Sequence, residues 1–238
     1  MKKRISSIFC LLALAITSMQ AKDYNVKDYG AIGDGKTLDH IAINATIDTC
    51  VAHGGGRVVL PAGTYLCGSI RMKSNVELHL MTGSKILAAP ASMKAYDEAE
   101  EFEGTAYQDG GHTYFKNSLI YAIGANDVSI TGRGMIDGEG LTRRDTEKAG
   151  NLQGGNIGTG DKAIAFKQCR NILIRDVTVY RGGHFGIIVT GCELGTIDNV
   201  IVDTNRDGID IDCCKYLTVS NCKINTPHDD GLVLKSSY

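Results

Sequence analysis

The chain has 238 residues and a formal net charge of −2 at pH 7, so it lacks the basic excess that nucleic-acid binding requires. Glycine contributes 29 residues, proline 3 and tryptophan none. Many glycines with few prolines are typical of a fold in which tight turns join short strands. The length is sufficient for one large domain with its own core.

The first 21 residues have the pattern of a secretory signal peptide. A basic start, Lys2–Arg4, precedes a mostly apolar stretch over residues 5–16, which is the expected order of regions in such a peptide. This stretch is too short for an ordinary membrane span. We therefore expect cleavage after Ala21 and an exported chain, periplasmic or extracellular, with no stable membrane span.

Residues 22–60 are predicted to form a strand and helix cap at the N-terminal end. Apolar residues recur there at helical spacing until the run Gly54–Gly56; they are Leu38, Ile41, Ala42, Ala45 and Val51. An amphipathic helix is a natural cover for the open end of a stacked β-structure. Short strands are predicted from residue 57 onward.

Two long loops interrupt the strands. Residues 90–116 carry six acidic side chains without periodicity, which predicts a solvated acidic face, with a substrate-binding loop as the alternative. Strand patterns return over 118–138, and a glycine-rich loop follows over 139–161.

Three near-copies of one pattern run from Cys169 to Lys235. The leading cysteines and the glycines that open the last strand of each copy recur every 22 or 23 residues. A fixed period of this length, filled with short β-branched runs, is typical of a parallel β-solenoid. We therefore predict an all-β protein, a right-handed parallel β-helix, over residues 61–238.

The cysteines follow the same repeat. Seven remain after removal of the signal peptide, and an odd number argues against a complete disulfide framework. Cys169, Cys192 and Cys214 share one position of the repeat, which predicts a buried stack of small side chains. The sequence does not decide whether a single disulfide forms among Cys213, Cys214 and Cys222.

Two copies of the repeat deliver carboxylates to the same turn. Asp207 and Asp230 each precede the strand glycine, so coils stacked about 4.8 Å apart make them neighbours, with Asp229 beside them. Carboxylates this close repel when both are ionised, which raises one pKa and divides the roles of acid and base. We predict that Asp207 and Asp230 hold a water as base and that Asp229 donates the proton. Turn capping is the alternative.

Five further residues are predicted to bind substrate or support the turn. Asn205 braces the turn, while Arg206 lowers the pKa of the neighbouring acid, contacts an anionic sugar or forms a surface ion pair. The other candidates for substrate contact are His184, His228 and Lys235.

Asp210 and Asp212 alternate with isoleucines along the same predicted strand. This alternation makes both carboxylates face outward, where they line a cleft floor or form a solvated face.

Motifs along the whole mature chain resemble a known family. The runs Asn25–Gly35 and Gly54–Tyr65 resemble the opening of pectate-lyase-superfold proteins, and Ser118–Ala122 with Ile130–Gly138 narrows the resemblance to the polygalacturonases, glycoside hydrolase family 28. Its Asn-Thr-Asp and paired-Asp motifs match Asn205-Arg206-Asp207-Gly208, with Arg in place of Thr, and Asp229-Asp230-Gly231.

The resemblance implies an exported glycoside hydrolase that cleaves galacturonic-acid-containing polysaccharide by inverting acid/base hydrolysis, with the same division of roles among the aspartates. We expect no cofactor or metal, a monomer, and pectic oligo- or polysaccharide as the partner. In that family the remaining motifs, a Gly-His-Gly and an Arg-x-Lys, lie further along than the paired aspartates, and this sequence ends at Tyr238 before either could appear. We therefore interpret the chain as a fragment that lacks C-terminal coils, whose own activity stays open.

Two other functions remain open. The first is a calcium-dependent pectate-type lyase on the same fold, because aspartate oxygens suit Ca²⁺; a lyase would also need an arginine or lysine base near the metal. The second is a non-catalytic carbohydrate-binding solenoid.

Overall fold

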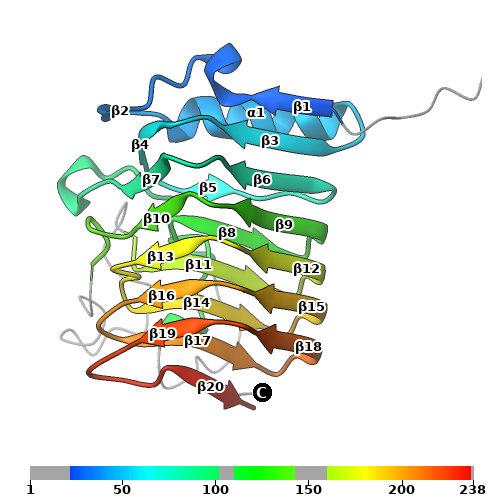
Figure 1. The fold of residues 1–238 in the computed structure, drawn as a ribbon, viewed down its shortest axis with the longest axis vertical. Coiled ribbons are helices and arrows are strands. Elements are labelled where there is room, and N and C mark those ends of the chain that lie inside the picture. Colours follow the sequence, from blue (N-terminus) through cyan, green and yellow to red (C-terminus); the bar gives the residue numbers. More distant parts are fainter. Residues whose placement is uncertain (1–21, 102–109, 143–159, 237–238) are drawn as a thin grey trace, which may run out of the picture.

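Short parallel strands stacked in three sheets make up most of the computed structural model, which describes residues 22–101, 110–142 and 160–236. Every pairing between two of the named strands is parallel, and the chain passes from sheet to sheet through turns (Figure 1). The predicted parallel β-helix is confirmed. In order along the stack, sheet A contains β1 (Lys22–Asn25), β3 (Gly56–Leu60), β6 (Val76–Leu80), β9 (Asn126–Gly132), β12 (Arg170–Arg175), β15 (Glu193–Asp198) and β18 (Lys215–Ser220).

The other two sheets complete each coil. Sheet B contains β2 (Asp34–Leu38), β4 (Gly63–Cys67), β7 (Ser84–Ala88), β10 (Met135–Asp137), β13 (Thr178–Tyr180), β16 (Ile201–Asp203) and β19 (Lys223–Asn225). Sheet C contains β5 (Ile70–Arg71), β8 (Ile120–Ile123), β11 (Lys162–Lys167), β14 (Phe185–Thr190), β17 (Asp207–Asp212) and β20 (Leu232–Lys235). Three short 3₁₀ helices span Val26–Tyr29, Ala91–Met93 and Gly110–His112.

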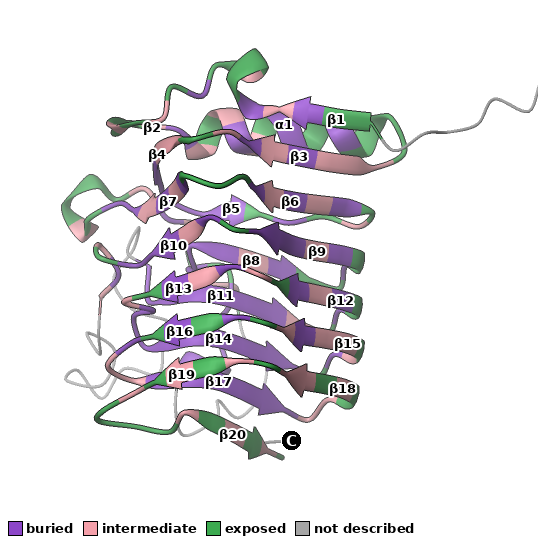
Figure 2. Cartoon of the chain, in the orientation of Figure 1, coloured by how far each residue is buried: buried purple, intermediate pink, exposed green. Residues whose placement is uncertain are grey.

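Inward-facing β-branched side chains form the core in vertical rows. On sheet A, Ile174 of β12 lies opposite Ile197 of β15, and Ile197 lies opposite Val219 of β18. Along β12, buried residues alternate with less buried ones, whereas β18 near the C-terminal end has no fully buried residue (Figure 2). Since a parallel ladder places equivalent residues of successive coils side by side, one apolar position per repeat yields a continuous core.

Polar ladders on the turns support the same stacking. Asp176, Asn199 and Asn221 adopt positive φ angles of 67°, 52° and 55°, a conformation that short polar side chains tolerate better than most. The Asn199 side-chain amide donates to Asp176 Oδ1 at 2.8 Å. Such bonds link one coil to the next at the position where the chain changes direction.

The predicted helix is present as α1 (His40–Ala52), but the predicted buried face is wrong. The buried residues are Ile43, Thr46, Ile47 and Cys50, whereas Ile41 is 68% exposed. Apolar residues lie on more than one side of this helix, so spacing alone does not select the side that packs against the core. The helix contacts β1, β3 and β5, and residues 22–60 also contribute β1–β3 to sheets A and B.

The described cysteines are all free thiols, so the disulfide left open among the last three is not formed in the structure. Cys169 and Cys192 are buried and Cys214 is partly buried. The backbone N–H of Cys169 donates to Cys192 Sγ, and that of Cys192 to Cys214 Sγ, each at 3.4 Å. The cysteine stack is therefore formed as predicted.

The predicted signal peptide, residues 1–21, lies outside the described residues. Among the helices that the structure describes, none is both long and apolar enough to cross a membrane.

Replacing Ile43 by Ala should lower the free energy of unfolding by about 2–5 kcal/mol, because it leaves a cavity between α1 and the core. Ile41→Ala on the same helix is the matched control and should change that free energy by less than about 0.5 kcal/mol, because Ile41 is exposed. Urea unfolding followed by circular dichroism measures both. Equal effects would contradict the observed orientation of the helix.

Candidate active site

The three predicted catalytic aspartates lie where the chain turns from sheet B into sheet C. Asp207 is the first residue of β17, and Asp229 and Asp230 precede β20. The Gly208 N–H donates to the Asp230 carbonyl at 2.9 Å, and Ile209 pairs with Leu232. The ladder relation between Asp207 and Asp230 is thus present in the backbone.

Glycine at position 208 is required by this close stacking. A Cβ atom there would lie 2.5 Å from the Gly231 carbonyl oxygen, closer than real Cβ contacts allow. The repeated Asp-Gly pair therefore has a packing cause: the glycine lets the coils approach, and the aspartate before it lies at the edge of the sheet.

Asp207 has an unusual electrostatic environment. Its side chain is hydrogen-bonded to that of Asp229, and the residue is only 4% exposed. Burial raises the pKa of Asp207 to about 7; the hydrogen bond and charge of Asp229 act in the same direction, while the charge of Lys235 opposes them. The side-chain partner of Asp207 is thus Asp229.

Asp229 contacts both Asp230 and Arg206. Its Oδ1 accepts the Asp230 N–H at 3.1 Å, and its Oδ2 forms an ion pair with Arg206 Nε at 3.1 Å. The Asp229 side chain is 29% exposed, and Asp230 is also exposed. Three roles were predicted for Arg206, and the structure contains one of them, the ion pair. The arginine side chain in this pair is mostly buried.

Asn205 and His228 connect the same two turns. His228 Nδ1 is hydrogen-bonded to Asn205 Oδ1 across neighbouring coils. This contact braces the turn before Asp207 against the turn that carries Asp229, so Asn205 has the position that the sequence suggested for it.

His184 is placed differently from the other predicted residues. It is buried, and its ring packs against that of Phe185 with centroids 4.5 Å apart. Its backbone N–H donates to the Asp161 carbonyl. In this arrangement His184 forms part of the wall behind the site and presents little surface to a substrate.

Lys235 lies on the outer face of sheet C, next to the two aspartates of β17. Its ammonium group forms an ion pair with Asp210 Oδ2 at 3.1 Å and contacts His112 Nε2 at 3.0 Å. Asp210 and Asp212 face outward from the strand as predicted, but both are fully buried. The prediction that Asp210 and Asp212 form a solvated face is therefore wrong.

The cause of this burial is the segment before β8. Residues 110–117, here called the covering segment, pack over the outer face of sheet C: Phe115 joins Ala165, Phe185 and Ile188 in a small apolar cluster. Both carboxylate oxygens of Glu100 accept the Phe115 N–H, at 2.9 and 3.0 Å. The expected solvated acidic loop is thus wrong for this part of residues 90–116.

His112 is the member of this region that the sequence did not reveal. It follows Gly110-Gly111 in a loop with no periodicity, and nothing in its spacing relates it to a repeat more than 100 residues later. The nearest signal is the mixed run His112–Phe115, in which two aromatic residues lie beside a histidine.

Within residues 22–101, 110–142 and 160–236, no group of three or more His, Cys, Asp and Glu side chains has a geometry that could hold a metal ion.

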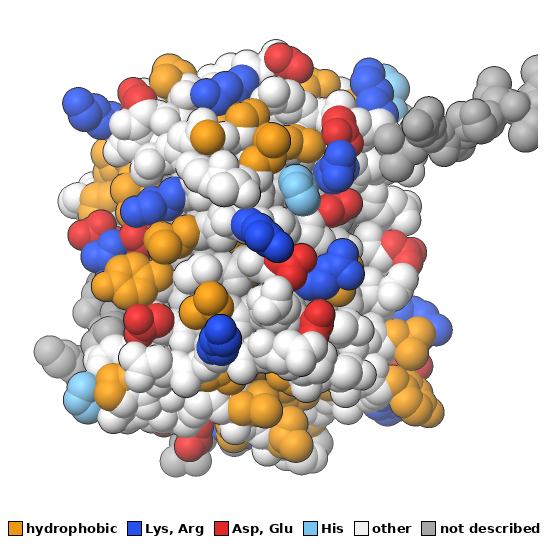
Figure 3. Space-filling view, viewed as in Figure 1, with side chains coloured by type: hydrophobic (Ala, Val, Ile, Leu, Met, Phe, Trp, Pro, Cys, Tyr) orange, Lys and Arg blue, Asp and Glu red, His pale blue; other side chains and the backbone are white. Residues whose placement is uncertain are grey.

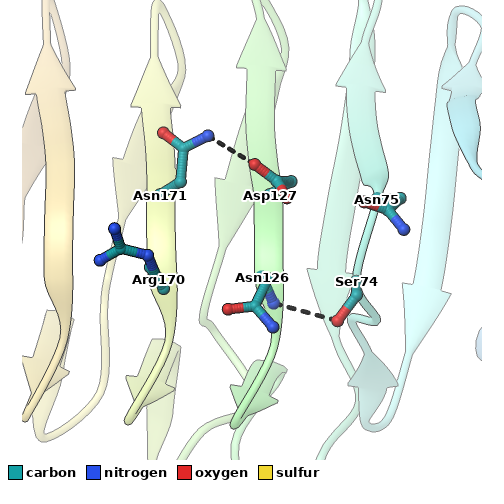
Figure 4. A pocket seen from close by; sticks show the side chains of 6 residues that line it. All are labelled: Ser74, Asn75, Asn126, Asp127, Arg170 and Asn171. Atoms are coloured by element: carbon teal, nitrogen blue, oxygen red, sulfur yellow. Dashed lines mark hydrogen bonds between the residues drawn. The ribbon is translucent and has the colours of Figure 1, made fainter.

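A separate polar hollow of about 430 Å³ lies on the turns that enter sheet A, away from the aspartates. Its lining includes Ser74, Asn126 and Arg170, and Figure 4 shows Asn171 and Asp127 pointing toward each other. Their 2.6 Å hydrogen bond links β9 to β12, so these side chains already serve the stacking of the coils.

On the face shown in Figure 3, acidic and basic side chains are interspersed, so charge alone does not mark a binding surface there.

Comparison with known proteins places these features in a family. The family model described as rhamnogalacturonase A/epimerase, pectate lyase-like, matches residues 24–232. An exo-poly-alpha-D-galacturonosidase of Dickeya chrysanthemi is 27% identical over 90% of this chain and 42% of its own length. An exopolygalacturonase of Platanus acerifolia is 26% identical over 87% of this chain and 51% of its own length.

A solved structure agrees with these relatives. The hyperthermoactive exopolygalacturonase of Thermotoga maritima superposes with a TM-score of 0.75 and 27% identity, covering 92% of this chain and 56% of that one. The chain thus spans about half the length of the curated relatives described above. It belongs to the rhamnogalacturonase A/epimerase family of pectate-lyase-like proteins, and its resemblance to the polygalacturonases of glycoside hydrolase family 28 is confirmed.

Proposed function

We propose that this chain carries the acid and base of an exported glycoside hydrolase that cleaves galacturonic-acid-containing polysaccharide with inversion. The observation that carries the proposal is the hydrogen-bonded pair Asp207–Asp229, which retains a proton near neutral pH, next to the exposed carboxylate of Asp230. Glycoside hydrolysis needs one carboxylic acid and one carboxylate. The polygalacturonase relatives support the class of substrate.

The geometry supports a definite movement of protons. Asp207 is buried and cannot reach a polysaccharide directly, whereas Asp229 is partly exposed. The proton held by the pair passes through Asp229 to the glycosidic oxygen, which leaves with its electron pair. Asp207, now ionised, takes a proton from water with Asp230, and the resulting hydroxide oxygen bonds to the anomeric carbon. The pair is then protonated again, so the cycle is balanced.

Arg206 is proposed to control this exchange. Its ion pair with Asp229 Oδ2 at 3.1 Å holds that carboxyl in place beside Asp207. A uronic acid carries its own carboxylate, and Arg206, His228 and Lys235 are the basic residues proposed to attract it. Asn205 keeps His228 in place from the neighbouring coil.

Asp229→Asn should lower the rate of reducing-end release from polygalacturonic acid by about 10²–10⁴-fold, because the amide cannot donate the proton. Asp198→Asn, on sheet A of the preceding coil, is the matched control and should keep the wild-type rate. Saturated products formed in EDTA are expected. Unsaturated products that absorb in the ultraviolet and require calcium would instead identify a lyase, and binding of oligogalacturonate without turnover would identify a carbohydrate-binding protein.

The stereochemistry is tested separately. Proton NMR recorded during the first minutes of hydrolysis should show the β-anomer of the new reducing end, since the α-linkage is inverted. Initial release of the α-anomer would show that one of the aspartates acts as a nucleophile instead.

Stability should also depend on the protonation of Asp207. The pKa of this carboxyl rises from 3.8 to about 7 on folding, so the folded protein holds a proton that the unfolded chain releases between these values. This contribution is fully present below about pH 4 and is lost as the pH rises through about 7. Relative to Asp207→Asn, the wild-type free energy of unfolding should fall over this range in urea titrations. Parallel curves would show that the pKa is not raised.

A further inference from the structure

Beneath the covering segment, four ionisable side chains form one cluster, His112, Asp210, Asp212 and Lys235, here called the His112 cluster. The Lys235 ammonium lies 3.0 Å from His112 Nε2 and 3.1 Å from Asp210 Oδ2. On the other side of the ring, His112 Nδ1 lies 3.6 Å from Asp212 Oδ2. The cluster joins the covering segment to β17 and β20.

The imidazole of His112 is held firmly in this cluster. It is fully buried, and its edge packs against the ring of Phe185 with centroids 5.0 Å apart. The next residue, Thr113, accepts a hydrogen bond from Lys167 of β11 through its carbonyl at 3.4 Å. Glu100 in turn binds the backbone of Phe115 and lies 3.9 Å from Lys167. The ring is therefore supported from two sides.

The contacts also define which ring nitrogen carries the proton. A lysine ammonium has three donors and no acceptor, so the 3.0 Å contact requires His112 Nε2 to accept. The ring is then neutral, with its proton on Nδ1 facing the Asp212 carboxylate. In this form His112 adds no second positive charge beside Lys235.

We propose that His112 is a positioning residue of the active site: it holds the Lys235 ammonium beside Asp210, on the same strand as Asp207. Lysine has a long flexible side chain that readily turns into solvent, and that of Lys235 is 28% exposed, so a route outward exists. A second hydrogen bond from a buried ring keeps it inward. The proposal rests on the proposed function for the role of Asp207 in catalysis.

The consequence concerns the proton shared by Asp207 and Asp229. Besides burial, the charges of Asp229 from the turn before β20 and of Asp210 from its own strand raise the pKa of Asp207, whereas the charge of Lys235 from β20 lowers it. A lysine that leaves this position would let burial and the two carboxylates raise the pKa further. His112 thereby sets the pH range in which the pair can both give and take a proton.

The first experiment measures the Asp207 carboxyl directly, without relying on turnover. In the full chain labelled with ¹³C at aspartate carboxyls, NMR titration gives its pKa, and Asp207→Asn identifies the signal. His112→Leu and Lys235→Met should each raise this pKa by about one pH unit, and the double variant should raise it no further. His112→Gln, which keeps an acceptor, should restore most of the wild-type value.

His79→Leu is the matched control. His79 also contacts neighbouring side chains, Thr131 and Glu77, but it lies on sheet A and should leave the pKa of Asp207 unchanged. On polygalacturonic acid, the pH at which the rate falls should move upward in His112→Leu by the same amount as the measured pKa. A folded His112→Leu protein with a lower melting temperature but an unchanged Asp207 pKa would overturn the proposal.

A second measurement needs no variant and covers the case in which His112→Leu does not fold. The ¹⁵N imidazole signals of the wild-type protein should show a neutral His112 with its proton on Nδ1. A proton on Nε2 would exclude the lysine contact and overturn the proposal. If the wild-type protein cleaves no pectic substrate, the proposed function fails, while both NMR results still decide the role of His112.

Discussion

Parallel pairing between successive coils is the constraint on which the other features of this protein depend. Hydrogen bonds hold neighbouring strands about 4.8 Å apart, so in the last coils each strand residue lies beside the one 22 or 23 positions later. Apolar residues at one position of the repeat therefore become a core, as in the row Ile174, Ile197 and Val219. Asparagines at another become a ladder of amides. Aspartates of neighbouring turns are brought together, and burial, with the hydrogen bond and charge of Asp229, raises the pKa of Asp207 to about 7.

The same constraint explains how much of the fold and site could be predicted. The repeat alone indicates a parallel β-helix and brings Asp207 and Asp230 onto one ladder, because position along a solenoid is set by counting residues. It also predicts that Asp210 faces outward. Counting does not give the direction of a side chain in a turn, and so it did not show that the carboxyl of Asp207 meets Asp229 instead of Asp230. Nor did it choose the buried side of α1, where Ile43 packs and Ile41 does not.

What lies outside the repeat could not be predicted by counting. The burial of Asp210 and Asp212 comes from the covering segment, whose path depends on packing of Phe115 and on the carboxylate of Glu100. A buried polar group must find partners to offset its lost hydration; Lys235 lies beside Asp210 and His112 Nδ1 beside Asp212. The sequence shows each of these residues but not their meeting, because an irregular loop has no period that relates it to a strand.

The contact between His112 and Lys235 also has a kinetic meaning. In the last coils, strand pairings close loops of 22 or 23 residues, as between Ile174, Ile197 and Val219, but this contact joins residues 123 positions apart. Long closures are entropically costly and form late. The stack can grow coil by coil from α1, yet the covering segment finds its last partner only when β20 has docked. During synthesis the protein would therefore acquire most of its architecture before the contact between the covering segment and β20 forms.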